Sequence, residues 1–389
     1  GALRETRKGI KDPSTFAALT KQLKRADKPS ESGTPPKDVE KSIESISGQT
    51  TGALLDQVLE ETQEKAPETE SSRGTSEWNN FLNQIVKPHL VPDIEPQQAE
   101  MLNAVEIESA WRGVHFLTSR LETDEQLKLY LLDISKAELA ADLGSKEDLR
   151  STGIYKLLAE QTVETFGGEP WAVLAGNYIF DNSREDAELL GCIAKIAKAS
   201  GAPFITAAND KVLGCESLSK TPDPDDWQRL HGAEESQAWE ALRKLPDAAY
   251  LGLALPRFLL RLPYGSDTDP AEQFEFEEMP ANPDHNYYLW GNPCFACVYL
   301  LAQAFTHHGW NLRPGIIQDI EGLPLYIYKE EGKSRVKPCA EVVLTERAAE
   351  TILDKGLMPL LSFRNQDIIR LARFQSIADP LTCLVGRWS

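Results

Sequence analysis

The sequence predicts an α/β fold, in which a mixed, largely parallel sheet is flanked by helices. Apolar runs of strand length alternate with segments of helical periodicity, which is the pattern of a sheet covered by crossover helices. Several of these runs are apolar at nearly every position, as in parallel strands that are buried on both faces. The N-terminal stretch, by contrast, is too polar to fold and predicts a disordered extension that carries one short helix.

The predicted strands are apolar runs that end near Gly, Pro, Asn or Asp, the residues that favour turns. In chain order they lie at 126–134, 171–180, 202–208, 250–255, 322–328, 340–345 and 357–363.

The predicted helices are segments in which apolar residues recur at the spacing of one helix face. In chain order they lie at 78–85, 99–120, 136–143, 154–165, 185–200, 239–245, 294–305 and 346–355. Gly356 follows the last of these as a helix stop.

We expect three parts along the chain. Residues 1–52 are a basic and polar extension or linker, with a short amphipathic helix after Asp12-Pro13. The basic face of that helix is usually solvated, and docking on an acidic region of this chain or of a neighbour is the alternative. Residues 53–66 hold a second short helix, and residues 76–389 form the α/β globular region.

The helix within 53–66 is isolated between polar linkers. Its acidic face includes Asp56, and its apolar face consists of Leu54, Leu55, Val58, Leu59 and Thr62. A helix this short is marginal in water, so its apolar face needs a partner. Binding in the groove of another protein is our interpretation, and packing back on its own domain is the alternative.

Composition excludes several classes of protein. The net charge of -19 is unsuited to coating nucleic acid or an anionic membrane. No apolar run approaches the ~20 residues that cross a bilayer, and the basic N-terminus lacks the apolar core of a signal peptide. Six cysteines without a regular spacing fit reduced thiols, so a cytoplasmic location is expected. The chain begins with Gly1, which fits a trimmed, tagged or partial chain.

The segment from Leu255 to Gly265 combines strong apolar character with two arginines. Pro256 permits a helical turn that Pro263 would stop, and this turn would place Arg257 and Arg261 on one side. An unpaired guanidinium inside a core costs several kcal/mol, so each arginine needs an acceptor. The sequence leaves two alternatives: the charges are satisfied within the chain, or the segment docks an acidic partner.

Few motifs point to chemistry. Cys294 and Cys297 have the spacing of a redox pair at a helix start, but they continue an apolar helix face, where core cysteines are ordinary. No second cysteine pair stands at metal-ligand spacing from Cys294 and Cys297. No His or Glu stands at metal-ligand spacing from His307-His308 either, so we expect no metal. No glycine-rich dinucleotide motif, phosphate-binding loop or serine nucleophile elbow is present. We therefore expect no cofactor and a structural or binding role rather than an enzyme.

Several motifs in succession resemble one family, the large contractile-sheath subunit of bacterial type VI secretion systems (TssC/VipB/EvpB). The resemblance extends over roughly 78–376. It is carried by the E-x-x-W-R-G segment at 107–117, the helix and A-P-F strand at 188–205, L-P-R-x-L-x-R-x-P-Y-G at 255–265, F-x-F-E-E at 274–278, Y-L-W-G-N at 288–292, and later strands at 322–324 and 340–344.

The resemblance implies a protomer that pairs with a small sheath subunit (TssB/VipA-like). Such pairs and further copies of the chain form a helical tube around an inner tube (Hcp-like), and contraction drives secretion. It also implies that a recycling AAA+ ATPase (ClpV-like) binds the helix of Leu54, Leu55, Asp56, Val58, Leu59 and Thr62. The composition, as stated above, argues against direct contact with nucleic acid and against membrane insertion. Arg112, Arg257 and Arg261 become candidates for pairing between subunits or within the chain.

The sequence departs from the family at its end. Large sheath subunits continue well beyond the segment that matches 374–376, whereas this chain stops at Ser389, so we expect a short variant or a truncated chain. An accessory protein of the sheath or baseplate that does not polymerise is the second reading. A thiol-redox enzyme that uses Cys294 and Cys297 is the third.

Overall fold

The computed structural model describes residues 105–144, 148–227, 233–266, 268–269, 277–279, 285–330 and 333–388. The predicted extension at 1–52, the predicted helix within 53–66 and the predicted helix at 78–85 lie outside these ranges.

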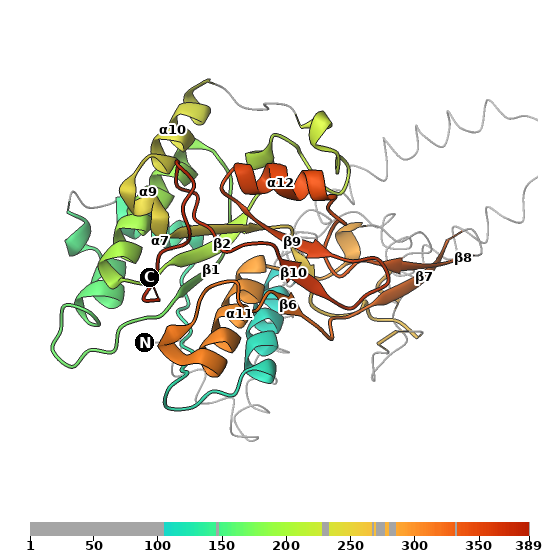
Figure 1. The fold of residues 1–389 in the computed structure, drawn as a ribbon, viewed down its shortest axis with the longest axis horizontal. Helices are drawn as coiled ribbons and strands as arrows, with labels where there is room; N and C mark the ends of the chain where they lie inside the picture. Colours follow the sequence, from blue (N-terminus) through green and yellow to red (C-terminus); the bar gives the residue numbers. More distant parts are fainter. Residues whose placement is uncertain are drawn as a thin grey trace, which may run out of the picture. The chain divides into compact units, whose positions relative to one another are not determined.

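A six-stranded sheet forms the centre of this region, in the order β1-β2-β3-β9-β10-β6 (Figure 1). The first four strands are parallel to their neighbours, and β10 is antiparallel to both β9 and β6. The predicted class, α/β with a mixed and largely parallel sheet, is confirmed. The strands are β1 (Leu174–Phe180), β2 (Phe204–Ala208), β3 (Leu251–Leu255), β6 (Asp319–Ile320), β9 (Met358–Ser362) and β10 (Ile369–Leu371).

Two antiparallel pairs stand outside the sheet. One joins β4 (Phe258–Leu259) to β5 (Trp290–Gly291), and the other joins β7 (Tyr326–Glu330) to β8 (Lys333–Lys337).

Helices cover both faces of the sheet, and a separate hydrophobic core lies on each face. One core is formed with α7 (Lys136–Gly144), α8 (Gly153–Tyr155) and its π-helical continuation η3 (Lys156–Glu160), α9 (Arg184–Ser200), α10 (Ala233–Arg243) and α12 (Glu346–Asp354). The other is formed with α11 (Pro293–His308) and the helix at 105–120. Figure 1 shows α11 and α12 on opposite sides of the sheet.

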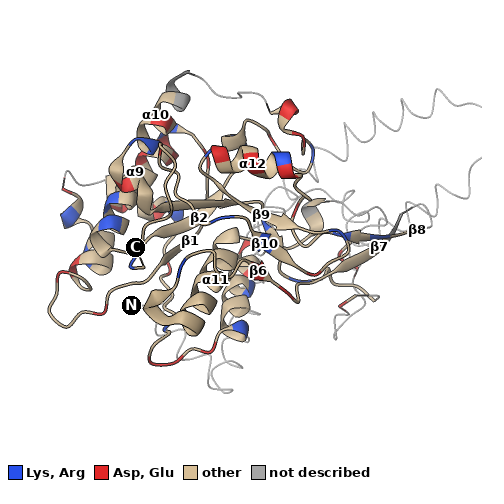
Figure 2. Cartoon of the chain, in the orientation of Figure 1, with Lys and Arg blue, Asp and Glu red and all other residues tan. Residues whose placement is uncertain are grey.

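Both faces of the central strands are buried, as their unbroken apolar runs predict. In β3, Leu251, Leu253 and Leu255 lie in the core beside α9, while Ala254 lies in the core beside α11. Figure 2 shows α11 free of acidic and basic residues, in contrast to the charged outer faces of α9 and α12. From Pro293 to Ala304 this helix is buried on nearly all sides, because strands, the helix at 105–120 and the C-terminal segment enclose it.

Local sequence signals set the ends of the long helices. Ser183 caps α9 by accepting a hydrogen bond from the Asp186 N–H, and Gly201 ends the helix with a φ of 68°. Asn292 caps α11 in the same way by accepting from the Cys294 N–H. These capping residues explain why α9 and α11 agree with the sequence prediction to within a few residues.

Three predictions of local structure were wrong. Residues 126–134 form no strand with any described residue, because an apolar run becomes a strand only where another backbone pairs with it. Residues 340–345 make a single bridge at Ala340 and then turn so that Thr345 caps α12. The expected helical turn at 256–262 is extended, since Leu259 and Leu260 donate backbone hydrogen bonds to Cys339 and Leu289 on neighbouring segments.

Gly113 lies where the helix at 105–120 meets α11. A methyl group added to Gly113 would lie 2.2 Å from the ring of Phe295, which is itself buried. The Trp-Arg-Gly sequence therefore allows close approach of two helices in this core.

We predict that Gly113→Ala destabilises the protein. Alanine gains about 1 kcal/mol of helix propensity, but overpacking against the enclosed Phe295 ring costs about 1–3 kcal/mol, and the cost rises when the helices must separate. Urea denaturation should therefore show a lower free energy of unfolding. Gly144→Ala is the control, because no described atom lies within 4 Å of its added methyl group. Equal or greater stability of Gly113→Ala would contradict this packing.

Candidate functional site

The segment at 255–265 leaves β3, forms β4 and sends its two arginines into different clusters of charge. Arg261 is buried, with 6% of its surface exposed, whereas the side chain of Arg257 is 41% exposed. The prediction that a helical turn places Arg257 and Arg261 on one side is therefore wrong.

Every N–H donor of the Arg261 guanidinium has an acceptor within the chain. Nε donates to Glu108 Oε1 at 2.7 Å and Nη2 to Glu108 Oε2 at 3.1 Å. Nη1 and Nη2 donate to the two oxygens of Glu278 at 2.6 and 2.9 Å, and Nη1 also donates to the Leu262 carbonyl at 3.0 Å. The guanidinium lies 4.1 Å from the ring centre of Tyr264. A buried arginine with two bidentate carboxylates is thus fully paired.

Arg112 extends this cluster from the helix at 105–120. Its Nε donates to Glu108 Oε1 at 2.7 Å, and its Nη2 donates to the Tyr264 hydroxyl at 2.8 Å. Burial raises the pKa of Glu108, but hydrogen bonds from Arg261 and Arg112 outweigh burial and lower the pKa below its ordinary value. Burial likewise opposes the charge of Arg261, and the bonds to Glu278 and Glu108 raise its pKa.

Arg257 enters a second cluster, around Glu341. Its backbone N–H donates to Glu341 Oε2 at 2.9 Å, and its Nη2 donates to Oε1 at 2.5 Å. His285 Nε2 lies 3.0 Å from the same Oε1. Burial raises the pKa of Glu341, but the bond to His285 and the charge of Arg257 overcome it and hold the pKa at about 2. Glu341 therefore stays ionised as a structural acceptor.

Asp210 interacts electrostatically with this cluster and has a raised pKa. Burial raises its pKa to about 6, and the charge of Glu341 adds to the shift. Two effects lower the pKa of Asp210 and partly offset this rise. One is the hydrogen bond that the Leu218 N–H donates to Asp210 Oδ2 at 2.8 Å, and the other is the positive charge of Arg257 and His285.

The Tyr-Leu-Trp-Gly-Asn segment at 288–292 ties these clusters to the sheet. Ser109 donates its hydroxyl to the Trp290 carbonyl at 2.8 Å, and Trp290 Nε1 donates to the His285 carbonyl at 3.0 Å. Asn292 Nδ2 donates to the Tyr178 carbonyl of β1 at 2.8 Å. Residues far apart in the sequence therefore meet in one hydrogen-bonded assembly.

The two cysteines of the redox hypothesis are fully buried in α11. Burial raises the pKa of Cys297 to about 12 and that of Cys294 well above its ordinary value. Redox-active thiols have the opposite properties, a lowered pKa and partial exposure. Within the described ranges, no group of three or more His, Cys, Asp or Glu side chains is placed to hold a metal.

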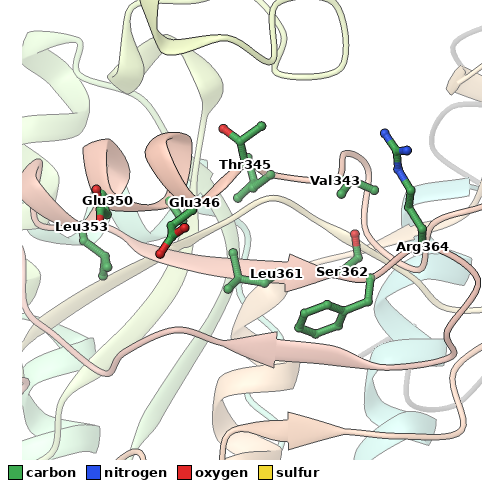
Figure 3. A pocket seen from close by; sticks show the side chains of 11 residues that line it. Val343, Thr345, Glu346, Glu350, Leu353, Leu361, Ser362 and Arg364 are labelled. Atoms are coloured by element: carbon green, nitrogen blue, oxygen red, sulfur yellow. The ribbon is translucent and has the colours of Figure 1, made fainter.

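A groove of about 490 Å³ lies between α12 and the end of β9 (Figure 3). Its floor is apolar, with Leu353 and Leu361, and Glu346, Glu350 and Arg364 stand along its sides. None of Arg112, Arg257 and Arg261 lines it. The groove has no nucleophile paired with a base, so it offers no catalytic arrangement.

The sequence identified the arginines but not their carboxylate partners. Glu108 stands four residues before Arg112, a helical ion-pair spacing that could have revealed that contact. Glu278 lies in the acidic pair of the Phe-x-Phe-Glu-Glu segment, but nothing local connects it to Arg261. Glu341 and His285 give no signal in the sequence, because only the fold brings them to Arg257.

Comparison with known proteins gives two matches. The family model described as VipB: EvpB/VC_A0108, tail sheath N-terminal domain, matches residues 98–378. The Type VI secretion system sheath protein TssC1 of Pseudomonas aeruginosa is 39% identical over 283 residues, which are 71% of this chain and 56% of that protein. The chain thus spans about half the length of this curated relative. No described helix has the length and apolar character needed to cross a membrane.

We predict that Arg261→Met destabilises the fold strongly. The substitution leaves Glu108 and Glu278 without their shared partner, and breaking a buried ion pair in this way costs about 3–5 kcal/mol. Urea denaturation measures the loss. Arg184→Met removes an arginine from an exposed pair with Glu188 and should change the free energy of unfolding by less than about 1 kcal/mol. A similar small effect for both substitutions would contradict the assignment of Arg261 to the core.

We predict that Asp210→Asn changes how stability depends on pH. The pKa of Asp210 is raised on folding, so the folded state binds its proton more tightly, and stability is lost as pH rises towards about 6. Asparagine does not titrate, and its oxygen can still accept from Leu218. The free energy of unfolding of the variant, minus that of the wild type, should increase by about 2 kcal/mol between pH 4.5 and 7.5. Parallel stability profiles for the two proteins would show that Asp210 does not titrate in this way.

Proposed function

The chain belongs to the VipB (TssC/EvpB) family of type VI secretion sheath proteins, and from this membership we propose that it is a structural subunit of the contractile sheath. In this proposal it pairs with a small sheath subunit (TssB/VipA-like). The pairs, together with further copies of the chain, form a helical lattice around an inner tube (Hcp-like). Contraction of the lattice drives secretion.

The observation that carries the proposal is that charged residues from three of the family motifs pair with one another inside the chain. Three of them contribute Glu108 and Arg112, Arg261 and Tyr264, and Glu278 to one network of ion pairs. The network leaves no reactive group free for a substrate, and it joins the helix at 105–120 to the exit of β3. Residues shared with a sheath family thus stabilise a scaffold, as a building block requires.

Two of the arginines combine internal pairing with exposure. The side chains of Arg112 and Arg257 are 34% and 41% exposed. We propose that these two contact neighbouring subunits at the lattice, while Arg261 acts within the chain.

The proposed role is not enzymatic and requires no cofactor. It places the protein in the bacterial cytoplasm, without contact with nucleic acid and without insertion into a membrane. The net charge of -19 supports protein partners over anionic polymers.

The experiment that tests the proposal is co-expression with the small sheath subunit, followed by negative-stain electron microscopy. The proposal predicts a stable complex and hollow tubes of regular repeat. A stable complex without tubes would favour the accessory, non-polymerising role. Failure of the two proteins to associate would contradict the proposed function.

We further propose that the helix within 53–66 is the recognition element for a recycling AAA+ ATPase (ClpV-like). The double substitution Leu55→Asp and Leu59→Asp places two charges on its apolar face, so capture by the purified N-terminal domain of the ATPase should fall at least about tenfold. Glu60→Gln, on the acidic face and outside the set of recognition residues, is the control for a change of charge and should retain most of the binding. Retention of the double variant in the pulldown would contradict this role.

A further inference from the structure

A lysine, a histidine and a glutamate form a line of contacts in the second charge cluster, outside the network of Arg261. Lys337 is the last residue of β8, and its Nζ lies 3.5 Å from Nδ1 of His285 in the turn η7 (His285–Tyr287). The other ring nitrogen, Nε2, lies 3.0 Å from Glu341 Oε1. An amine, an imidazole and a carboxylate thus stand in the order of a nucleophile, its general base and the group that orients the base.

The carboxylate of Glu341 decides which nitrogen of His285 carries the hydrogen when the ring is neutral. The pKa of Glu341 is about 2, so the group is ionised and can only accept, and Nε2 must donate to it. Nδ1 then keeps its lone pair beside Lys337 Nζ. His285 can therefore take a proton from the amine, and the charge of Glu341 stabilises the imidazolium that results.

Two further contacts hold the imidazole in this orientation. Its ring lies against the indole of Trp290, with ring centres 5.0 Å apart and planes tilted by 30°, and Trp290 Nε1 donates to the His285 carbonyl at 3.0 Å. Glu341 is itself fixed by the backbone N–H and Nη2 of Arg257. A base that is positioned by several segments of the fold needs little reorganisation before it acts.

The amine of Lys337 lies against two aromatic walls. Its Nζ is 5.0 Å from the ring centre of Tyr288 and 5.5 Å from that of Trp290. Burial lowers the pKa of Lys337, and the charge of Glu341 opposes this shift without cancelling it. A larger share of this lysine is therefore neutral than of a lysine in water, and the neutral amine is the nucleophilic form.

The amine is nevertheless within reach of a small reagent. Lys337 is half-buried, and 24% of the His285 side chain is exposed. Cys294 and Cys297, the nucleophiles of the redox hypothesis, are by contrast closed off from solvent. Lys337 thus combines a base, a lowered pKa and access, the properties that the two thiols lack.

We propose that Lys337 is a site of covalent modification, at which an acyl phosphate acylates the amine and His285 acts as the general base. Nζ attacks the carbonyl carbon, so that a bond from nitrogen to carbon forms and the bond from that carbon to the phosphate oxygen breaks. Inorganic phosphate leaves with the electron pair of the broken bond. The proton of the attacking nitrogen passes to His285 Nδ1 and from there to water.

The surroundings of the amine favour this class of reagent. An acyl phosphate has an activated carbonyl that a neutral amine attacks directly, and a small one can pass between the rings of Tyr288 and Trp290. The amide that forms is uncharged, which suits these aromatic walls. A phosphoryl or carboxyl group on the same nitrogen would instead bring a negative charge towards Glu341.

Acylation would change the contacts of the Tyr-Leu-Trp-Gly-Asn segment. It removes the positive charge over Tyr288 and Trp290 and the hydrogen that Lys337 donates to His285. The inference goes beyond the proposed function and does not depend on it, since it concerns an amine of the single chain.

Acetyl phosphate and the purified full chain test the inference. Peptide mass spectrometry measures the rate of acetylation at each lysine, and the reference is Lys195, an exposed lysine of α9. At neutral pH Lys337 should react at least about tenfold faster than Lys195. In urea that unfolds the chain, the two rates should agree to within about twofold, because the neighbours of Lys337 are then removed.

The substitution His285→Gln tests the role of the base. Glutamine can still donate to Glu341 but cannot take up the proton, so the rate at Lys337 should fall at least about tenfold while that at Lys195 stays within about twofold. His308→Gln, which removes an exposed imidazole at the end of α11, is the matched control and should leave both rates unchanged.

Two outcomes would overturn the inference. One is a folded wild-type chain in which Lys337 reacts no faster than Lys195, and this comparison decides even if His285→Gln fails to fold. The other is rapid acetylation of Lys337 that a folded His285→Gln variant retains, because the amine would then react without the base. Neither outcome bears on the formation of tubes, so the proposed function is judged separately.

Discussion

The fold depends on the satisfaction of one buried guanidinium. Arg261 sits just beyond the end of the central strand β3, where water does not reach it, and an arginine there is tolerated only if all its donors find acceptors. Glu108 lies 153 residues before Arg261, in the helix at 105–120, and Glu278 lies 17 residues after it. Pairing Arg261 therefore requires three separate segments to be correctly placed at once.

The same requirement explains why motifs scattered through the sequence belong to one structure. Arg112 and Tyr264 complete the first cluster, and Glu341 draws Arg257 and His285 into the second. Both clusters lie on the segment that leaves the sheet. Ion pairs fix the position of this segment on the two-core sheet, and the apolar cores supply the bulk of the burial.

The sequence predicts the features that depend on residues close together in the chain, and it misses those that depend on contacts between residues far apart in the chain. The core strands β1, β2 and β3 and the helices α9, α11 and α12 were predictable because apolar periodicity and capping are local properties. Residues 126–134 read as a strand from the same periodicity, yet a strand also needs a paired backbone, which the sequence does not show. The segment after β3 was misread as helical because its backbone bonds go to residues distant in the sequence. Apart from the Glu108–Arg112 pair, whose spacing of four residues is a local signal, the carboxylate partners of the arginines were invisible for the same reason.

The central claim is that the charged residues of the motifs act on one another inside this chain to hold the fold. A double-mutant cycle between Arg261→Met and Glu278→Leu, read by urea denaturation, tests it most directly. The account predicts that the double variant loses at least about 2 kcal/mol less stability than the sum of the single variants, because each single change leaves the other charge unpaired. Losses that add to within about 0.5 kcal/mol would show that the two residues do not stabilise each other, and the claim would be wrong.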